Sequence, residues 1–173
     1  MQELWKKSII PMKIIKMISL ISIFWSCQNT NNKNLYSNLN EKIDAWHLAA
    51  SYAEFDDYFD FIADKGIFIG TDISERWTKN EFSNFSKPFF DQGKAWTFLA
   101  KERHIRFGEE KSLAWFDEVL DTRMGQCRST GVLRLIKDEW KLEHYQLSVT
   151  IDNDLMHQFI ELSNQFINEK TGN

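Results

Sequence analysis

Four strand-like segments separated by short turns fill the second half of this chain, and they constrain its fold more than any other feature. The segments cover residues 96–107, 112–120, 127–136 and 140–149 and are rich in β-branched and aromatic residues. Residues 108–111 and 137–139 form two of the turns between them. Consecutive strands joined by such short turns favour an antiparallel meander.

Helical patterns come before this meander and after it. Apolar residues recur at helical spacing over residues 40–52 and 54–63, and Thr78 with Glu81 forms a capping box for a helix over 78–90. Pro88 is expected to end or kink that helix. Residues 67–69 form a short apolar strand, and residues 154–167 an amphipathic final helix. The sequence therefore predicts one α+β domain, with helices on one face of a curved sheet.

A short apolar run near the N-terminus ends at a cysteine. Lys13 and Lys16 precede the run at residues 17–25, and Ser26 and Cys27 follow it. The run is shorter than the roughly 20 residues that span a bilayer, and a basic start with a short apolar segment is typical of a signal peptide. The small residue before Cys27 resembles a bacterial lipobox. We expect a lipoprotein signal peptide over residues 1–27, with a plain apolar anchor as the alternative.

The residues after Cys27 divide into a tether and a domain. Residues 28–38 are polar and rich in Asn, which indicates a flexible tether, and residues 39–173 form the domain. Lipid on Cys27 would anchor the protein in the bacterial cell envelope, periplasmic or surface-exposed. The other cysteine, Cys127, would then have no disulfide partner and is expected to be a packed core residue.

Charge and motifs exclude several functions. The formal net charge is −4 although the first 26 residues are basic, so the domain itself is acidic. An acidic domain without a basic stripe is not expected to bind nucleic acid. The domain also lacks a metal-ligand cluster, a glycine-rich phosphate loop and a Gly-x-Ser-x-Gly motif. We therefore expect no cofactor and no metal.

One carboxylate falls on an apolar strand face. Glu118 alternates with Ala114, Phe116 and Leu120 on the second predicted strand. A carboxylate is costly to bury without a partner, so Glu118, or its neighbour Asp117, must either reach solvent or pair with a cation. Arg128 on the next strand is the expected partner. Such a pair can be structural, can bind a ligand, or can hold a general base, and the sequence leaves these three roles open.

Several segments together resemble the SnoaL-like branch of the nuclear transport factor 2-like superfamily, from Leu39 to Leu155. They are Ile43–His47, Phe68–Asp72 with Glu75–Trp77, Ala95–Phe98, Ala114–Glu118, Cys127–Leu133 and Trp140–Leu147. The resemblance implies a cone: a bent antiparallel sheet of about four to five strands wrapped around three N-terminal helices, plus a C-terminal helix. It also implies a cavity at the wide end of the cone.

The resemblance supplies most of the expected site. In the superfamily a Trp-x-x-x-His pattern often turns its later residues into the cavity, which implies that His144 and Gln146 face it. Asp72 is either a turn residue or a group at the cavity mouth, with Trp77 as one wall. The expected ligand-binding residues are Asp72, Trp77, Trp96, Glu118, Arg128, His144 and Gln146. We assign no catalytic residue.

Three functions fit this pattern, because a fold alone does not determine function. The first is an envelope-anchored domain that binds a small, partly apolar molecule. The second is a cofactor-independent isomerase, dehydratase or cyclase that uses Asp72, Glu118 or His144. The third is an interaction module that forms a homodimer through an exposed sheet face.

Overall fold

The computed structural model describes residues 37–171. The signal peptide, Cys27 and residues 28–36 of the predicted tether lie outside the described residues. The chain divides into two units, residues 1–42 and 43–173. Among the described residues, no helix is both long and apolar enough to cross a membrane.

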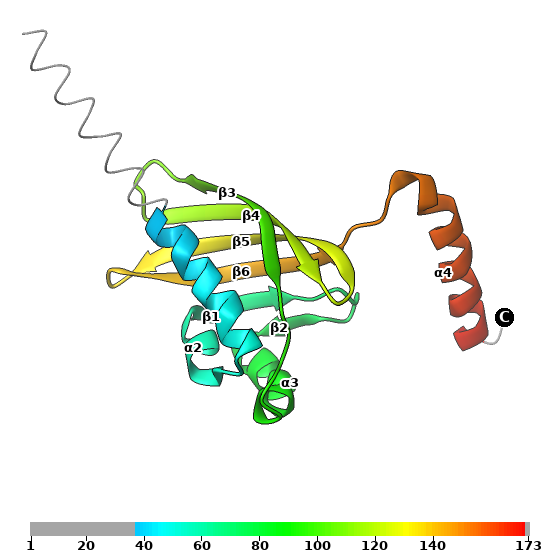
Figure 1. Ribbon diagram of the computed structural model, residues 1–173, viewed down its shortest axis with the longest axis horizontal. Helices are drawn as coiled ribbons and strands as arrows, with labels where there is room; N and C mark the ends of the chain where they lie inside the picture. Colours follow the sequence, from blue (N-terminus) through cyan, green and yellow to red (C-terminus); the bar gives the residue numbers. More distant parts are fainter. Residues whose placement is uncertain (1–36, 172–173) are drawn as a thin grey trace, which may run out of the picture. The chain divides into compact units, whose positions relative to one another are not determined.

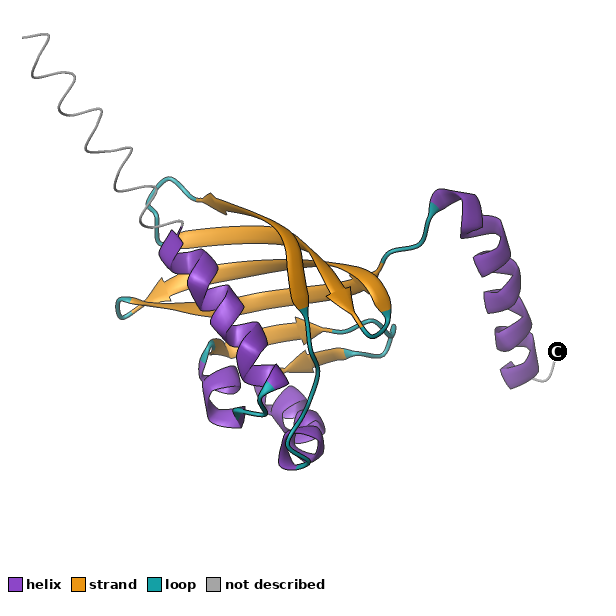
Figure 2. Cartoon of the chain, in the orientation of Figure 1, coloured by secondary structure: helices purple, strands orange, loops and turns teal. Residues whose placement is uncertain are grey.

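The second unit is an α+β structure, as the sequence predicts (Figures 1 and 2). An N-terminal helix that includes residues 37–51 leads into it. The helices that follow are α2 (Phe55–Asp60), α3 (Lys79–Asp91) and α4 (Met156–Thr171), with a 3₁₀ turn, η1 (Asn153–Leu155). The strands are β1 (Ile62–Ile69), β2 (Arg76–Thr78), β3 (Leu99–Phe107), β4 (Leu113–Thr122), β5 (Gly125–Ile136) and β6 (Glu139–Val149).

The six strands form one curved, mixed sheet in the order β2-β1-β6-β5-β4-β3. Strands β3 to β6 pair antiparallel with their neighbours, as the meander predicts. Strand β1 instead pairs parallel with β6 and antiparallel with β2. The sheet thus has more strands than expected, and it contains one parallel pair.

The predicted end of the second helix was wrong, whereas the helix predicted over 78–90 ends within one residue of its expected end. Strand β1 begins at Ile62, within the predicted second helix, because it pairs with β6 from that residue onward. Helix α3 continues through Pro88 to Asp91. Pro88 lies near the C-terminal end of α3, so its missing N–H removes only one hydrogen bond of the last turns. The capping box of Thr78 and Glu81 is confirmed.

Aromatic side chains fill much of the space between the concave sheet face and the helices. Trp46 of the N-terminal helix stacks on Tyr58 of α2 and meets Tyr145 of β6 edge-on. Trp46, Tyr58 and Tyr145 are all buried, and Phe116 of β4 packs beside Tyr145. These rings form the aromatic core of the domain.

Candidate functional site

A pocket of about 180 Å³ opens beside this aromatic core. Its wall is mostly apolar and comes from β1, β2, α3, the segment before β3, the β4–β5 turn and β6. The apolar lining residues are Phe68, Trp77, Phe82, Phe85, Phe89, Ala95, Trp96, Phe98, Met124 and Leu147, and the polar ones are Thr71, Glu75, Thr97 and Arg123, with Gly70 between them. An apolar wall with a few polar groups is the usual lining of a small-molecule site.

The rings of this wall pack on one another. Trp77 stacks on Phe82 and Phe85, with ring centroids 5.4 and 4.8 Å apart, and Phe82 stacks on Trp96 at 5.7 Å. Trp77 is placed by the three-residue strand β2, where it pairs with Phe68. The capping box then starts α3 at once and brings Phe82 and Phe85 alongside. Side chains that support one another in this way are preorganised, so a ligand need not order them.

The polar side of the pocket is held by two loops. Arg123 and Met124 form the two-residue turn between β4 and β5, and the Thr122 hydroxyl fixes that turn by donating to the Gly125 carbonyl at 2.9 Å. The hydroxyl of Thr71 lies 4.0 Å from the Met124 sulfur, which links this turn to the β1–β2 loop. The pocket mouth is therefore built from residues far apart in the sequence.

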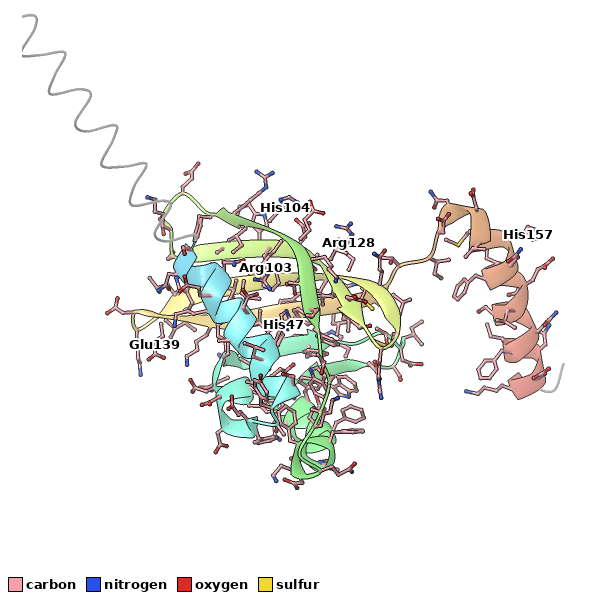
Figure 3. All side chains as sticks on the ribbon, in the orientation of Figure 1. His47, Arg103, His104, Arg128, Glu139 and His157 are labelled. Atoms are coloured by element: carbon pink, nitrogen blue, oxygen red, sulfur yellow. The ribbon has the colours of Figure 1, made fainter. Side chains whose placement is uncertain are left out.

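A second cluster, centred on the buried Glu118, joins the N-terminal helix to the sheet. Figure 3 labels two of its members, His47 on the helix and Arg103 on β3. Glu118 Oε1 accepts from the Ser129 hydroxyl at 2.7 Å and lies 2.8 Å from His47 Nε2, while Oε2 accepts from Arg103 Nε at 2.8 Å. Arg103 Nη1 also donates to Asp44 at 2.7 Å. The side chains of Glu118 and Arg103 are 0% and 4% exposed. We call Asp44, His47, Arg103, Glu118 and Ser129 the polar cluster.

The polar cluster keeps Glu118 ionised in the interior. Burial by itself raises the pKa of the Glu118 carboxyl, but the hydrogen bond with His47, the charges of His47 and Arg103 and the Ser129 hydroxyl together outweigh it and lower the pKa. Both carboxylate oxygens are occupied, and none of the polar cluster lines the aromatic pocket. Its arrangement ties the N-terminal helix to β3, β4 and β5.

The structure places the seven predicted ligand residues in four different surroundings. Trp77 and Trp96 line the pocket, whereas Glu118 belongs to the polar cluster. Asp72 is exposed and accepts from the backbone and hydroxyl of Ser74, and these hydrogen bonds lower its pKa. This geometry is that of a turn residue.

Of the two carboxylates expected as partners of Arg128, the structure pairs Asp117 with it and not Glu118. Alternation along β5 puts Ser129 on the concave face with Glu118, and Arg128 on the opposite face, where it is exposed. Its nearest acid is Asp117, at 3.5 Å. Arg103, which lies directly across from Glu118 on β3, takes the place expected for Arg128 (Figure 3).

His144 and Gln146 also lie on the sheet face opposite the core. Val132 pairs with His144 but Leu133 pairs with Leu142, so Glu143 is an extra residue in β6. This bulge shifts the alternation by one residue: Trp140 and Leu142 are buried before it, and Tyr145 and Leu147 after it. The inward orientation that the resemblance implied for His144 and Gln146 is therefore wrong.

Sequence reasoning missed His47, Arg103 and Ser129 as partners of Glu118. His47 is separated from Glu118 by 71 residues, and no local pattern links them. Arg103 follows an extra residue in β3, Lys101, which resets the alternation of that strand. Of these three partners, only Ser129 could have been found from the sequence. A two-residue turn at Arg123 and Met124 sets the register of β4 and β5, and that register puts Ser129 opposite Glu118.

Two buried tyrosines predict a loss of stability in alkali. Burial raises the pKa of Tyr58 and of Tyr145 well above its usual value, and the Glu118 charge raises that of Tyr145 further. Their contribution is complete below pH ~10, where unfolded tyrosine ionises, and is lost as the pH rises further. The free energy of unfolding should then fall by up to about 1.4 kcal/mol per pH unit for each tyrosine.

Chemical denaturation between pH 8 and pH 11 measures this loss. Neither hydroxyl makes a hydrogen bond of good geometry with another described residue, although Ser129 and Trp96 lie near enough to Tyr145 and Tyr58 to lower their pKa slightly. The double variant Tyr58→Phe/Tyr145→Phe should therefore fold and show a shallower alkaline slope. An unchanged slope would contradict the assignment.

Comparison with known proteins agrees with this architecture. The sequence pattern of the SnoaL-like domain matches residues 39–152. The chain belongs to the SnoaL-like domain family. No curated protein matches it.

Solved structures similar to this SnoaL-like domain share its fold at low sequence identity. An NTF2-like protein of unknown function from Pseudomonas putida KT2440 is 14% identical, with a TM-score of 0.57 over 68% of this chain and 87% of that one. An NTF2-like protein from Cytophaga hutchinsonii ATCC 33406 is 15% identical, with a TM-score of 0.54 over 68% and 98%. A protein of unknown function with a cystatin-like fold from Nostoc punctiforme PCC 73102 is 15% identical, with a TM-score of 0.53 over 65% and 88%.

Proposed function

We propose that this SnoaL-like domain binds a small, partly apolar molecule in its aromatic pocket. The observation that carries the proposal is the space of about 180 Å³ left open among the mutually stacked rings of Trp77, Phe82, Phe85 and Trp96. An engineered apolar cavity of about 150 Å³ holds benzene. The pocket therefore suits one ring with a small substituent, and it is smaller than sites for drug-sized ligands.

Binding fits the site better than cofactor-free catalysis. A general base must reach the substrate, directly or through one water. Glu118 has the chemistry of a base, but its oxygens are engaged by His47, Arg103 and Ser129, and it does not line the pocket. The acid that lines the pocket is Glu75, whose Oε2 accepts from the Asp72 backbone N–H at 3.1 Å.

We further propose that the domain acts at the bacterial cell envelope, anchored by lipid on Cys27. The support is the sequence: two lysines, a short apolar run, and a serine directly before Cys27. Metabolic labelling with a radioactive fatty acid tests the anchor. Label should appear on the wild type and be absent from Cys27→Ala; an unlabelled wild type would end this proposal. A homodimer through the outer sheet face stays a prediction.

Retained small molecules test the binding proposal. The full chain is purified from cells, and its small molecules are extracted and identified by mass spectrometry. We expect one class of molecule in the wild type and none in Ala95→Phe, which fills the pocket from its wall. The matched control is Ala100→Phe, an exposed position on β3 that does not line the pocket. Equal recovery from all three proteins would contradict the proposal.

A further inference from the structure

Two charged side chains line the aromatic pocket, and their surroundings differ. Glu75 is held by its own loop: its Oε2 accepts from the Asp72 backbone N–H, and its side chain lies against Gly70 so closely that a Cβ there would overlap it. The Arg123 side chain makes no hydrogen bond or ion pair with another residue in the range 37–171. The Glu75 carboxylate is therefore hydrogen-bonded within the protein, whereas the Arg123 guanidinium can donate to a ligand.

The position of Arg123 is fixed by its backbone. Arg123 occupies the first place of a two-residue turn, and the Thr122 hydroxyl accepts from the Met124 N–H at 3.0 Å while donating to the Gly125 carbonyl. Gly125, with φ of +91°, closes the turn. Because the turn is fixed at both ends, the backbone of Arg123 stays at the edge of the pocket. Only its long side chain can move there.

We propose that the pocket selects a small aromatic monocarboxylate, whose ring lies among Trp77, Phe85 and Trp96 and whose carboxylate pairs with Arg123. This inference rests on the proposed function and names its ligand class. The volume of about 180 Å³ accommodates a single ring with one carboxylate, which the planar guanidinium can bind through two parallel hydrogen bonds. Thr71 and Thr97 add hydroxyls on the same lining.

Three probes of similar size separate the charge from the ring: benzoate, benzyl alcohol and benzylamine. Each is titrated into the full chain, and binding is followed by tryptophan fluorescence at low salt. A charge-assisted hydrogen bond at an exposed edge is worth about a tenfold change in affinity. We expect benzoate to bind about tenfold more tightly than benzyl alcohol, benzylamine to bind most weakly, and the benzoate preference to shrink with added salt.

Variants assign the preference to one side chain. Arg123→Gln should bind benzyl alcohol as the wild type does and lose the tenfold preference for benzoate. The control Arg106→Gln removes one exposed positive charge from β3, outside the pocket, and should keep the preference. Both substitutions are at exposed sites, so folding is preserved.

The outcomes separate this inference from the proposed function. Three results would each overturn the proposal that the ligand carries a carboxylate paired with Arg123: equal binding of benzoate and benzyl alcohol, tighter binding of benzylamine, or an unchanged benzoate preference in Arg123→Gln. The pocket would remain a binding site in each case. Failure of all three probes would overturn the ligand class. If the wild type also retained no extracted molecule, the proposed function would fail with it.

Discussion

Replacing Glu118 by Gln should lower the free energy of unfolding by about 3 kcal/mol, because it removes the carboxylate that balances a buried cation. The Arg103 side chain is 4% exposed and donates to Glu118 Oε2. In Glu118→Gln, Asp44 is the one acid of the polar cluster that still balances the positive charge of Arg103. Urea denaturation at pH 7 measures the change. The matched control is Asp117→Asn, since Asp117 is about half exposed and lies 3.5 Å from Arg128. That exposed pair should contribute less than about 1 kcal/mol.

The acid dependence of stability gives a second readout of the same replacement. The pKa of Glu118 is lowered in the folded state, so its contribution is present above the ordinary carboxyl range and is lost as the pH falls through the folded pKa. The wild type should therefore lose stability toward pH 3 more steeply than Glu118→Gln. A loss equal to that of Asp117→Asn, or parallel acid profiles, would show that the polar cluster does not stabilise the domain.

Adding one methyl group at Gly131 should destabilise the domain by about 2 kcal/mol or more. Gly131 is buried on β5 directly opposite Phe116, and a Cβ there would overlap the Phe116 ring. Phe116 packs beside Tyr145 in the aromatic core, so the ring has little space into which it can move. Overpacking of this kind costs about 1–3 kcal/mol.

A double-mutant cycle assigns that cost to the ring. Phe116→Leu shortens the side chain that Gly131→Ala would strike, so the double variant should be more stable than the sum of the two single changes predicts. Gly108→Ala is the matched control, because the nearest atoms to a Cβ at Gly108 lie at an ordinary 3.5 Å. If Gly131→Ala is as mild as Gly108→Ala, the close packing of Phe116 on β5 is incorrect.

Local signals predicted the parts of the fold that local chemistry controls. The capping box at Thr78 starts α3 where expected, and alternation on β4 puts Glu118 on the buried face with Phe116 and Leu120. The parallel pairing of β1 with β6 was not predictable, because it joins segments about 75 residues apart without a local turn. Loop closure over such a distance depends on the whole core.

The candidate site was predicted only in part, for two physical reasons. Extra residues at Lys101 and Glu143 reset the alternation of β3 and β6, which brings Arg103 inward and turns His144 outward. A bulge has no reliable sequence signature, so strict alternation fails beyond it. Trp77 and Trp96 line the pocket, and their binding role stays a prediction. Arg123 was missed because it is one residue of a turn whose position the sequence left open.

The central claim, that the aromatic pocket is a binding site, is tested most directly by the indole N–H signals of the protein in NMR spectra. Benzyl alcohol titrated into the full chain should shift the signals of Trp77 and Trp96, which line the pocket, and leave those of Trp115 and Trp140, which do not. Ala95→Phe should abolish the selective shifts. Equal shifts for these four of the seven tryptophans, or unmoved Trp77 and Trp96 signals in a protein that also retains no small molecule, would contradict the account.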